Sequence, residues 1–507
     1  MKTALCFSFI FAAALSIPAS GIQFRVATYN ASLNRNTQTQ LGTDLATSSN
    51  AQARQVAQIL QRVRPDVVLI NEFDYDANNP TLALTRFHDN YLAVQQAAGL
   101  APLNYPYRYV APSNTGVPSG FDLDNNGSVT STPGTTAASR QDYGDDSFGF
   151  GEFPGQYSFA VYSRFPINPD AKRTFQLFKW KDMPGAVLPS LTSGSTAGDW
   201  YSPTELNVVR LSSKNHVDLR IELKPGVTFH LLASHPTPPS FDGGEDRNGR
   251  RNHDEIRLWA DYISNAAYLY DDAGVAGGLA ADQRFVILGD LNADPLDGDS
   301  FQSAVNQLRN HPLVNSTANP SSPGGTQQAQ LQGGRNNSHV GNPAYDTADF
   351  GDGSVGNLRV DHVLASKKGF TVVGSGVFWP LSTDPTFSLV SASDHRLVYL
   401  DLLVEPDVQG FHIDRSGSDA VLTWKTQPGI SYKVQTSPDL SAWGDAPTIA
   451  VIADGANQTA SARDPDAVGA GKKFYRVAAS YGSQASPQLA PAAATSPKPR
   501  ARPVRSR

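Results

Sequence analysis

Eight strongly apolar runs of strand length constrain the fold of this chain more than any other feature of its sequence. Most of them are apolar on both faces at their centres, so each strand needs a second sheet on one side and helices on the other. The runs span residues 22–32, 66–74, 157–164, 216–223, 227–235, 284–292, 359–366 and 396–404. The pattern predicts an α/β (α+β) domain over residues 22–406.

Two segments carry apolar side chains at helical spacing. The first is residues 50–63, which Ser48 or Ser49 can cap. Pro65 stops this helix, and the second helix begins at about Asn252. The apolar faces consist of Val56, Ile59, Leu60 and Val63 in the first and of Ile256, Trp259 and Ile263 in the second.

The run "RFVILGDLNADP" ends on two polar side chains, Asp290 and Asn292. Alternation along a strand would place both on the same face, about 7 Å apart. Asp and Asn are favoured in turns, so the pair could be turn chemistry alone. The pair could equally form the floor of a metal-dependent active site, and this motif by itself leaves both interpretations open.

Other apolar runs also end, or begin, on acids, carboxamides or histidines. These residues are Asn30, Glu72, His235, Asp361 and the neighbours Asp394 and His395. Turns at strand ends explain one or two such residues without any function. A set of this size within one domain indicates a shared active site.

In this order, the set resembles the endonuclease/exonuclease/phosphatase superfamily, which includes pancreatic-type deoxyribonuclease, inositol polyphosphate phosphatases and bacterial sphingomyelinases. The resemblance rests on the Asn, the Glu, the Gly-Asp-x-Asn motif and the terminal Ser-Asp-His, and it covers roughly Ile22 to Val404. It implies a four-layered α/β/β/α sandwich with the site at one edge of two packed sheets, in a secreted bacterial member.

The resemblance also implies a metal site. Glu72 would bind the divalent cation, with Asn30 beside it and Asp394 as a further candidate ligand. Hard oxygen ligands suit Mg²⁺, with Mn²⁺ or Ca²⁺ as substitutes. The set lacks the thiolates or the HExxH helix expected of zinc.

The remaining members of the set would act on the phosphate. By resemblance, Asp290 would orient or deprotonate the attacking water, and Asn292 would hold the scissile phosphate. His235 and His395, the latter oriented by Asp361, would bind phosphate oxygens. Independently, phosphoester hydrolysis needs charge on the non-bridging oxygens to be neutralised. A carboxylate such as Asp361 can keep a neighbouring histidine protonated at neutral pH.

Two long polar insertions, residues 111–156 and 318–357, interrupt the domain, and loops of this length are usually functional or poorly ordered. The first contains "DLDNNGSVT", in which Asp122, Asp124 and Asn126 match the front half of an EF-hand calcium loop. The twelfth position is Pro133 instead of Glu, and the residues that could replace it are Asp142, Asp145 and Asp146. The segment is either a structural Ca²⁺ site or a solvated acidic loop.

A basic cluster lies just before or at the start of the second helix. Its members are Arg247, Arg250, Arg251 and His253. A helix N-terminus favours anions, so we expect the cluster to clamp further phosphate oxygens of the substrate. The alternative is a charged loop whose arginines pair with Asp246, Asp254 and Glu255.

The two ends of the chain differ from this domain. Residues 1–21 show the apolar core and small residues of a secretory signal peptide, which predicts a secreted protein, extracellular or periplasmic, with no transmembrane segment. Residues 408–480 alternate in short strands and resemble a small β-sandwich of the fibronectin type III kind, which could bind a cell surface or polysaccharide. The composition of residues 481–507 predicts a disordered basic Pro/Ala/Arg tail.

Composition and net charge help to choose among the remaining hypotheses about function. The only cysteine, Cys6, lies in the predicted signal peptide, which excludes thiolate chemistry. A net charge of −6 provides no general positive field for polyanions. We therefore expect a secreted divalent-metal-dependent phosphoester hydrolase, a phosphatase or phosphodiesterase. An extracellular endonuclease cleaving DNA or RNA is the alternative. A non-catalytic surface or adhesion protein is disfavoured, because such a protein normally loses some of these residues.

Overall fold

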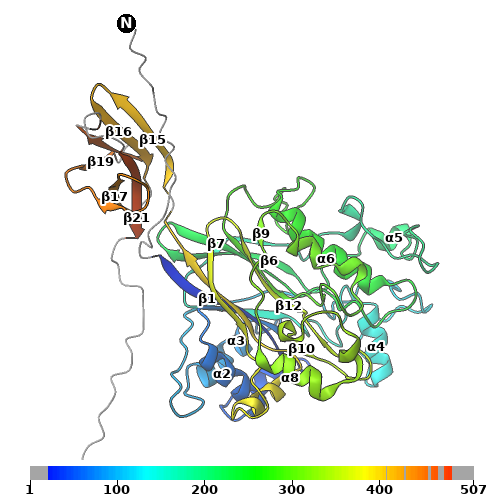
Figure 1. The fold of residues 1–507 in the computed structure, drawn as a ribbon. Coiled ribbons are helices and arrows are strands. Elements are labelled where there is room, and N and C mark those ends of the chain that lie inside the picture. The colour runs from blue at the N-terminus through cyan, green and yellow to red at the C-terminus, as the bar shows by residue number, and fades with distance from the viewer. Residues whose placement is uncertain are drawn as a thin grey trace, which may run out of the picture. The chain divides into compact units, whose positions relative to one another are not determined.

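The computed structural model describes residues 21–406, 408–426, 430–454, 458–465, 467 and 473–481. The chain forms two compact units that divide between Asp407 and Val408, and each is described separately (Figure 1). The predicted signal peptide and basic tail lie outside the described residues, apart from Gly21 and Tyr481 at their inner ends. Within the described residues, no helix has the length and apolarity needed to cross a membrane.

The first sheet of the larger unit has six strands. They are β1 (Ile22–Leu33), β2 (Val67–Phe73), β3 (Tyr107–Val110), β4 (Phe159–Ser163), β13 (Thr371–Val377) and β14 (Val398–Val404). Their order across the sheet is β13-β14-β1-β2-β4-β3. The central strand β1 runs antiparallel to β14 and parallel to β2, so the C-terminal ends of β1 and β2 meet at one edge.

The second sheet also has six strands. They are β5 (Ile167–Thr174), β6 (His216–Lys224), β7 (Val227–Ser234), β8 (Phe285–Asp290), β9 (Val314–Asn315) and β12 (Asp361–Ser366), in the order β5-β6-β7-β8-β12-β9. All eight apolar runs are strands, as predicted. The sequence did not reveal β3, β5, β9 and β13, which are the edge strands of the two sheets. The side chains of β3, β5 and β13 are mostly exposed or half-buried, so these strands lack a continuous apolar run.

The two sheets pack face to face through aromatic side chains. The ring of Phe24 in β1 lies 5.2 Å from that of Phe229 in β7 and 6.0 Å from that of Phe370. Helices cover the outer face of each sheet, which gives the predicted four-layered α/β/β/α sandwich (Figure 1).

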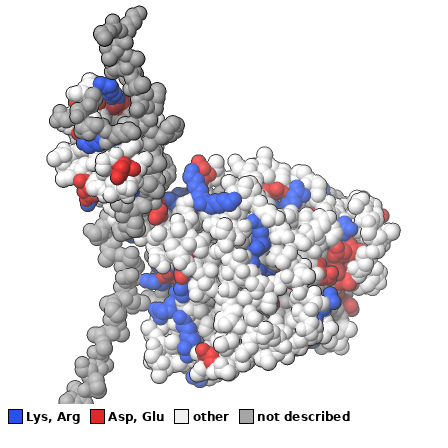
Figure 2. Space-filling view, in the orientation of Figure 1, with Lys and Arg blue, Asp and Glu red and all other residues white. Residues whose placement is uncertain are grey.

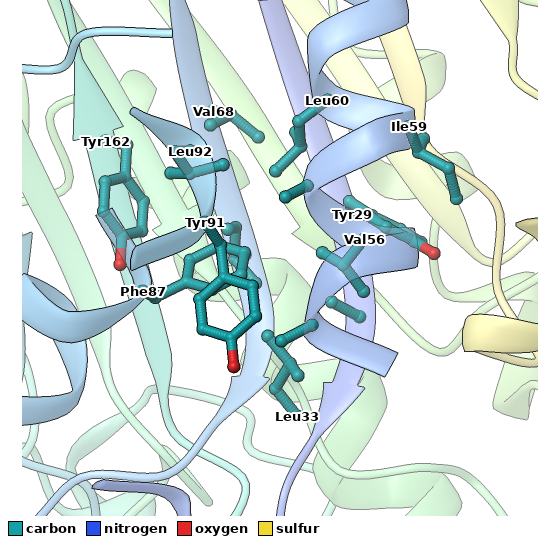
Figure 3. Packing of buried hydrophobic residues seen from close by; sticks show 14 of the residues in the cluster. Tyr29, Leu33, Val56, Ile59, Leu60, Val68, Phe87, Tyr91, Leu92 and Tyr162 are labelled. Carbon is teal, nitrogen blue, oxygen red and sulfur yellow. The ribbon is translucent and has the colours of Figure 1, made fainter. Parts of the chain in front are cut away.

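The outer face of the first sheet is covered by α2 (Ala51–Val63) and α3 (Leu82–Phe87). Figure 3 shows the apolar side of α2 directed at Tyr29 of β1 and Val68 of β2. The predicted apolar face of this helix is buried in full.

The cap of α2 differs from the prediction. Asn50 precedes the helix in extended conformation, and its side chain accepts a hydrogen bond from the backbone N–H of Ala53 at 3.0 Å. Asn50 therefore caps the helix in place of Ser48 or Ser49. Asn and Ser are about equally good caps, so propensity alone could not choose between these neighbours.

The outer face of the second sheet is covered by α6 (Arg247–Ile263), in which Trp259 is fully buried. The helix begins at Arg247, earlier than the predicted Asn252. Its first turn is held by a tertiary contact, since the Asn248 N–H donates to Asp242 at 2.6 Å. The polar residues of this turn carry no apolar repeat, so the periodic pattern could not locate the true start.

Both polar insertions have regular structure. The first contains α4 (Ala137–Asp145), and the second contains α8 (Pro323–Gln332), β10 (Ala348–Asp349) and β11 (Asn357–Leu358). The remaining α-helices are α1 (Gln40–Asp44), α5 (Pro203–Leu206) and α7 (Asn306–Arg309).

The smaller unit contains two antiparallel sheets around a shared apolar core that includes Leu422, Trp424 and Tyr475. One sheet has the order β15-β16-β20-β19 and the other β18-β17-β21. The strands are β15 (Gln409–Ser416), β16 (Asp419–Lys425), β17 (Ile430–Ser437), β18 (Gly444–Asp445), β19 (Val451–Asp454), β20 (Thr459–Asp464) and β21 (Phe474–Tyr481). This is a small β-sandwich.

We expect Leu60→Ala to lower the free energy of unfolding of the larger unit by about 2–5 kcal/mol, because it opens a cavity between α2 and the first sheet. Urea unfolding followed by tryptophan fluorescence measures this change. Arg54→Ala, at an exposed position of the same helix, is the matched control and should change stability little. Equal unfolding midpoints for the two variants would contradict the packing described here.

Candidate active site

Asp290 ends β8 and is almost fully buried. Its backbone N–H donates to the side-chain oxygen of Asn71 in β2 at 3.2 Å, so the first sheet contacts the end of the second. Gly289 makes this approach sterically feasible. A Cβ at that position would lie 2.0 Å from the carbonyl oxygen of Ser234 in the neighbouring strand. Asp361 lies directly opposite Asp290 in β12.

The carboxamide of Asn30 joins the two acidic residues of the site. Its Nδ2 donates to Glu72 Oε1 and to Asp290 Oδ2, both at 3.0 Å. Asn30 and Glu72 come together because β1 and β2 are parallel neighbours with Asn30 opposite Asn71. Asn34 donates to the second oxygen of Glu72 at 2.6 Å.

Two histidines flank Asp290, His235 just after β7 of the second sheet and His395 just before β14 of the first. His235 Nε2 lies 3.4 Å from Asp290 Oδ2, and His395 Nε2 lies 3.7 Å from the same oxygen. The opposite ring nitrogen of His395, Nδ1, lies 2.9 Å from Asp361 Oδ2. Asp361, His395 and Asp290 therefore form a continuous chain of alternating charge.

Burial and neighbouring charges set the protonation of this group. Burial alone would lower the pKa of His395, but Asp361 and Asp290 outweigh it and raise this pKa to about 10. Burial would raise the pKa of Asp290, but His395 and His235 hold it well below its usual range. Burial and the charge of Lys214 lower the pKa of His235. At neutral pH His395 is a cation, Asp290 an anion and His235 neutral.

Asn292 reaches the site in a way that differs from the prediction. The strand ends at Asp290, so strand alternation does not position Asn292. It adopts a left-handed conformation with φ of 51°, which Asn tolerates, and its N–H donates to Asp290 Oδ1 at 2.9 Å. Its Nδ2 donates to the carbonyl oxygen of Pro236 at 3.1 Å, which places the carboxamide beside His235.

The residues around Glu72 fit a hard divalent cation. The half-buried Glu72 carboxylate is bounded by two carboxamides, those of Asn30 and Asn34, whose side-chain oxygens are further candidate ligands. Such oxygen donors are the ligand type of Mg²⁺. Asp394, predicted as a further ligand, is exposed and accepts a hydrogen bond from Ser32 at 3.2 Å.

A second acidic group has a different role. Asp290, Asp361 and His395 offer ligand atoms within 4.8 Å of one another. The His395 ring lies between the two carboxylates, which raise its pKa and so favour a proton on the imidazole. This group is suited to holding and moving a proton.

The sequence also matches a known protein family, whose chemistry fits this site. A family model described as Endonuclease/Exonuclease/phosphatase family matches residues 27–395. The chain belongs to this family. Its members are hydrolases that act on phosphoester bonds, and the family generally uses divalent metals.

The chain also shows weak similarity to solved structures. The chain is similar to a crystal structure of TDP2 from Caenorhabditis elegans, with a TM-score of 0.36 and 13% identity over 76% of each chain. A truncated form of that protein matches with a TM-score of 0.34 and 13% identity over 75% of this chain and 98% of the other. Similarity this weak between the two proteins does not indicate which substrate this chain binds. No curated protein matches the sequence.

In this family member the first insertion gathers three carboxylates, those of Asp122, Asp124 and Asp146, with ligand atoms within 4.8 Å of one another. Asp146 is one of the residues expected to replace the missing Glu. Asn126, also predicted as a ligand, donates from Nδ2 to Asp124 Oδ2 at 3.0 Å, and its Oδ1 accepts from the backbone N–H of Ser128 at 2.8 Å. Calcium binding here stays a prediction.

The four residues predicted to clamp phosphate make contacts within the protein. Arg247 pairs with Glu245 at 2.5 Å, and His253 Nδ1 lies 3.0 Å from Asp254 Oδ1. Arg250 and Arg251 donate to the backbone carbonyls of Leu188, Ser195, Leu211, Phe148 and Arg210. The structure therefore does not present these side chains as a clamp, because partly buried guanidinium groups take the nearest carbonyl oxygens as acceptors.

Three residues of the site were not predicted from the sequence, namely Asn34, Thr347 and Lys214. Thr347, in the second insertion, donates to Asp361 Oδ2 at 2.9 Å and so helps to orient the partner of His395. Asn34 directly follows the last residue of β1, and a polar side chain at the end of an apolar strand is a signal that could have suggested it. No apolar strand ends at Thr347, so its position gave no local signal.

We expect Asp361→Asn to lower the pKa of His395, because one of the two carboxylates that raise it is neutralised. A raised histidine pKa keeps the cation until the pH rises through that value, so the variant loses the cation at a lower pH. The alkaline limb of the pH dependence of kcat/KM on a phosphoester should therefore move to lower pH.

The matched control for this experiment is Asp282→Asn, at an exposed carboxylate that pairs with Lys368. Asp282→Asn should leave the pH dependence of kcat/KM unchanged. An active Asp361→Asn variant with the wild-type alkaline limb would contradict the role assigned to this contact.

Proposed function

We propose that this chain is a secreted, divalent-metal-dependent hydrolase of small phosphate esters. The observation that carries the proposal is the bridge made by Asn30, whose carboxamide contacts both Glu72 and Asp290 at 3.0 Å. The bridge brings oxygen donors for a cation next to a buried carboxylate flanked by two histidines. Hydrolysis of a phosphoester needs these components together.

Glu72, with Asn30 and Asn34, would hold the cation, which supplies neutralising charge to the phosphoryl oxygens and acidifies water when bound. Asp290 orients the attacking water. Its pKa lies well below the usual range, so it is a weak base and acts mainly by accepting a hydrogen bond from that water.

His395 supplies positive charge where negative charge builds up. Its Nδ1–H donates to Asp361, which leaves Nε2–H, on the side of Asp290, free to donate to a phosphoryl or leaving-group oxygen. His235 and Asn292 add uncharged donors beside it. A fixed cation in a buried site stabilises the transition state more than it would in water.

Small esters are preferred to nucleic acid for an electrostatic reason. The net charge is −6, and on the face drawn in Figure 2 the basic side chains are scattered and do not form a continuous band. Binding of a nucleic acid normally uses such a band to neutralise several phosphates. Secretion is supported by the sequence of residues 1–21 and is tested by locating the protein in culture medium, periplasm and cytoplasm.

Purified protein assayed with p-nitrophenyl phosphate, bis-p-nitrophenyl phosphate, plasmid DNA and RNA, with Mg²⁺ or EDTA, tests the proposal. We expect Mg²⁺-dependent turnover of a small ester that EDTA abolishes. Rapid cutting of DNA without ester turnover would replace the proposal by the nuclease alternative. Identical behaviour with and without EDTA in every assay would support a non-catalytic protein.

We expect Asp290→Asn and His395→Gln each to lower kcat by about 10²–10⁴-fold with the fold intact. Circular dichroism and thermal unfolding check the fold. His230→Gln, at a histidine paired with Asp218 elsewhere in the second sheet, serves as the matched control and should retain activity. Full activity of Asp290→Asn would remove the basis of the assignment.

A further inference from the structure

Lys214 lies in the loop just before β6, and its side chain is buried, with 6% of its surface exposed. Its ammonium carries three N–H donors, yet it makes a single long hydrogen bond, to the carbonyl oxygen of Pro236 at 3.3 Å. A buried cation with so little compensation is costly and needs a reason.

An internal ion pair does not account for this lysine. Among the described residues, no carboxylate oxygen lies within 4.0 Å of its nitrogen. Burial lowers the pKa of Lys214, and the carboxylate of Glu255 makes the largest contribution in the opposite direction. That carboxylate is already occupied, because it accepts hydrogen bonds from the backbone N–H of Ser213 at 2.6 Å and of Thr237 at 2.7 Å.

The ammonium lies beside one of the proposed phosphate-binding residues, Asn292. It shares the carbonyl oxygen of Pro236 with Nδ2 of Asn292, which lies 3.1 Å from that oxygen. The charges of Asp290 and Glu72 both act on Lys214, and the charge of Lys214 acts in turn on His235.

The first insertion fixes the loop that carries Lys214. The backbone N–H of Asn114 donates to the carbonyl of Lys214 at 2.9 Å, and Asn215 donates to the carbonyl of Pro112 at 3.0 Å. At Gly149 a Cβ would lie 1.8 Å from the carbonyl oxygen of Ser213, so the insertion is pressed against the loop. These contacts hold the cation in place before any substrate binds.

We propose that Lys214 is a catalytic residue of the hydrolase and that its free N–H groups bind a non-bridging oxygen of the substrate's phosphoryl group. This inference rests on the proposed function. A lysine ammonium is a compact, strongly hydrated charge suited to phosphate oxygens, and its donors gain their missing acceptors when substrate enters. Lys214 thereby acts with His395 from a different element of the fold.

The test compares Lys214→Met and Lys214→Arg with the wild type, using the p-nitrophenyl ester that the wild type hydrolyses. We expect Lys214→Met to lower kcat/KM by about 10²-fold or more and to weaken inhibition by inorganic phosphate about tenfold. Lys214→Arg should recover part of both effects. The matched control is the exposed Lys172→Met, which should behave as the wild type.

A rescue experiment separates charge from folding. The only natural cysteine, Cys6, lies in the predicted signal peptide, so Lys214→Cys made in mature protein has a single thiol. Alkylation with 2-bromoethylamine adds an aminoethyl group to that sulfur and yields a lysine analogue. We expect kcat/KM to rise at least tenfold on alkylation, and alkylation with iodoacetamide, which adds no charge, should give no such rise.

The results of these experiments distinguish failure of the proposed function from failure of the role of Lys214. A wild type that turns over no phosphoester with any divalent metal would defeat the proposed function and, with it, this inference. An active wild type, together with Lys214→Met that keeps normal kcat/KM and phosphate inhibition, would overturn the role of Lys214 alone. If Lys214→Met does not fold, Lys214→Cys that mass spectrometry shows to be aminoethylated and that circular dichroism shows to be folded, yet that regains no activity, would overturn it equally.

Discussion

The burial of the Asp290 carboxylate is the constraint on which the rest of the site depends. A buried anion is stable only when hydrogen bonds and opposite charges compensate it. Asn30 donates to it from the first sheet, the N–H of Asn292 donates from the following turn, and His235 and His395 approach the same oxygen. Each compensating group comes from a different segment, so the site requires that both sheets be correctly packed.

The polar insertions support this arrangement, which strand-end residues alone would not fix. Thr347 orients Asp361, and the ring of Phe350 lies 5.4 Å from that of His395 in an edge-to-face contact. The first insertion holds the loop of Lys214 through backbone hydrogen bonds. Both segments lack an apolar repeat. Side-chain and backbone hydrogen bonds to the core hold them in a defined conformation.

Prediction succeeded where the physical signal is local and failed where it is not. The apolar runs gave eight of the twelve strands in the two large sheets, because burial on both faces leaves a continuous apolar pattern. The arginines near the start of α6 were assigned to substrate from their charge and position alone. The structure directs Arg250 and Arg251 to backbone carbonyls of other segments, and no local pattern in the sequence identifies those acceptors. Lys214 was missed for the same reason, since a lysine before a strand is ordinarily solvated.

The sequence by itself determined the central strands of both large sheets and the polar side chains at their ends, because apolar periodicity and the end of an apolar run are properties of neighbouring residues. Only the tertiary structure decided which of those side chains meet. Asn30 contacts Asp290 across 260 positions of the chain, and His395 contacts Asp361 across 34. Such contacts depend on strand register and sheet packing, which are set by the whole core together.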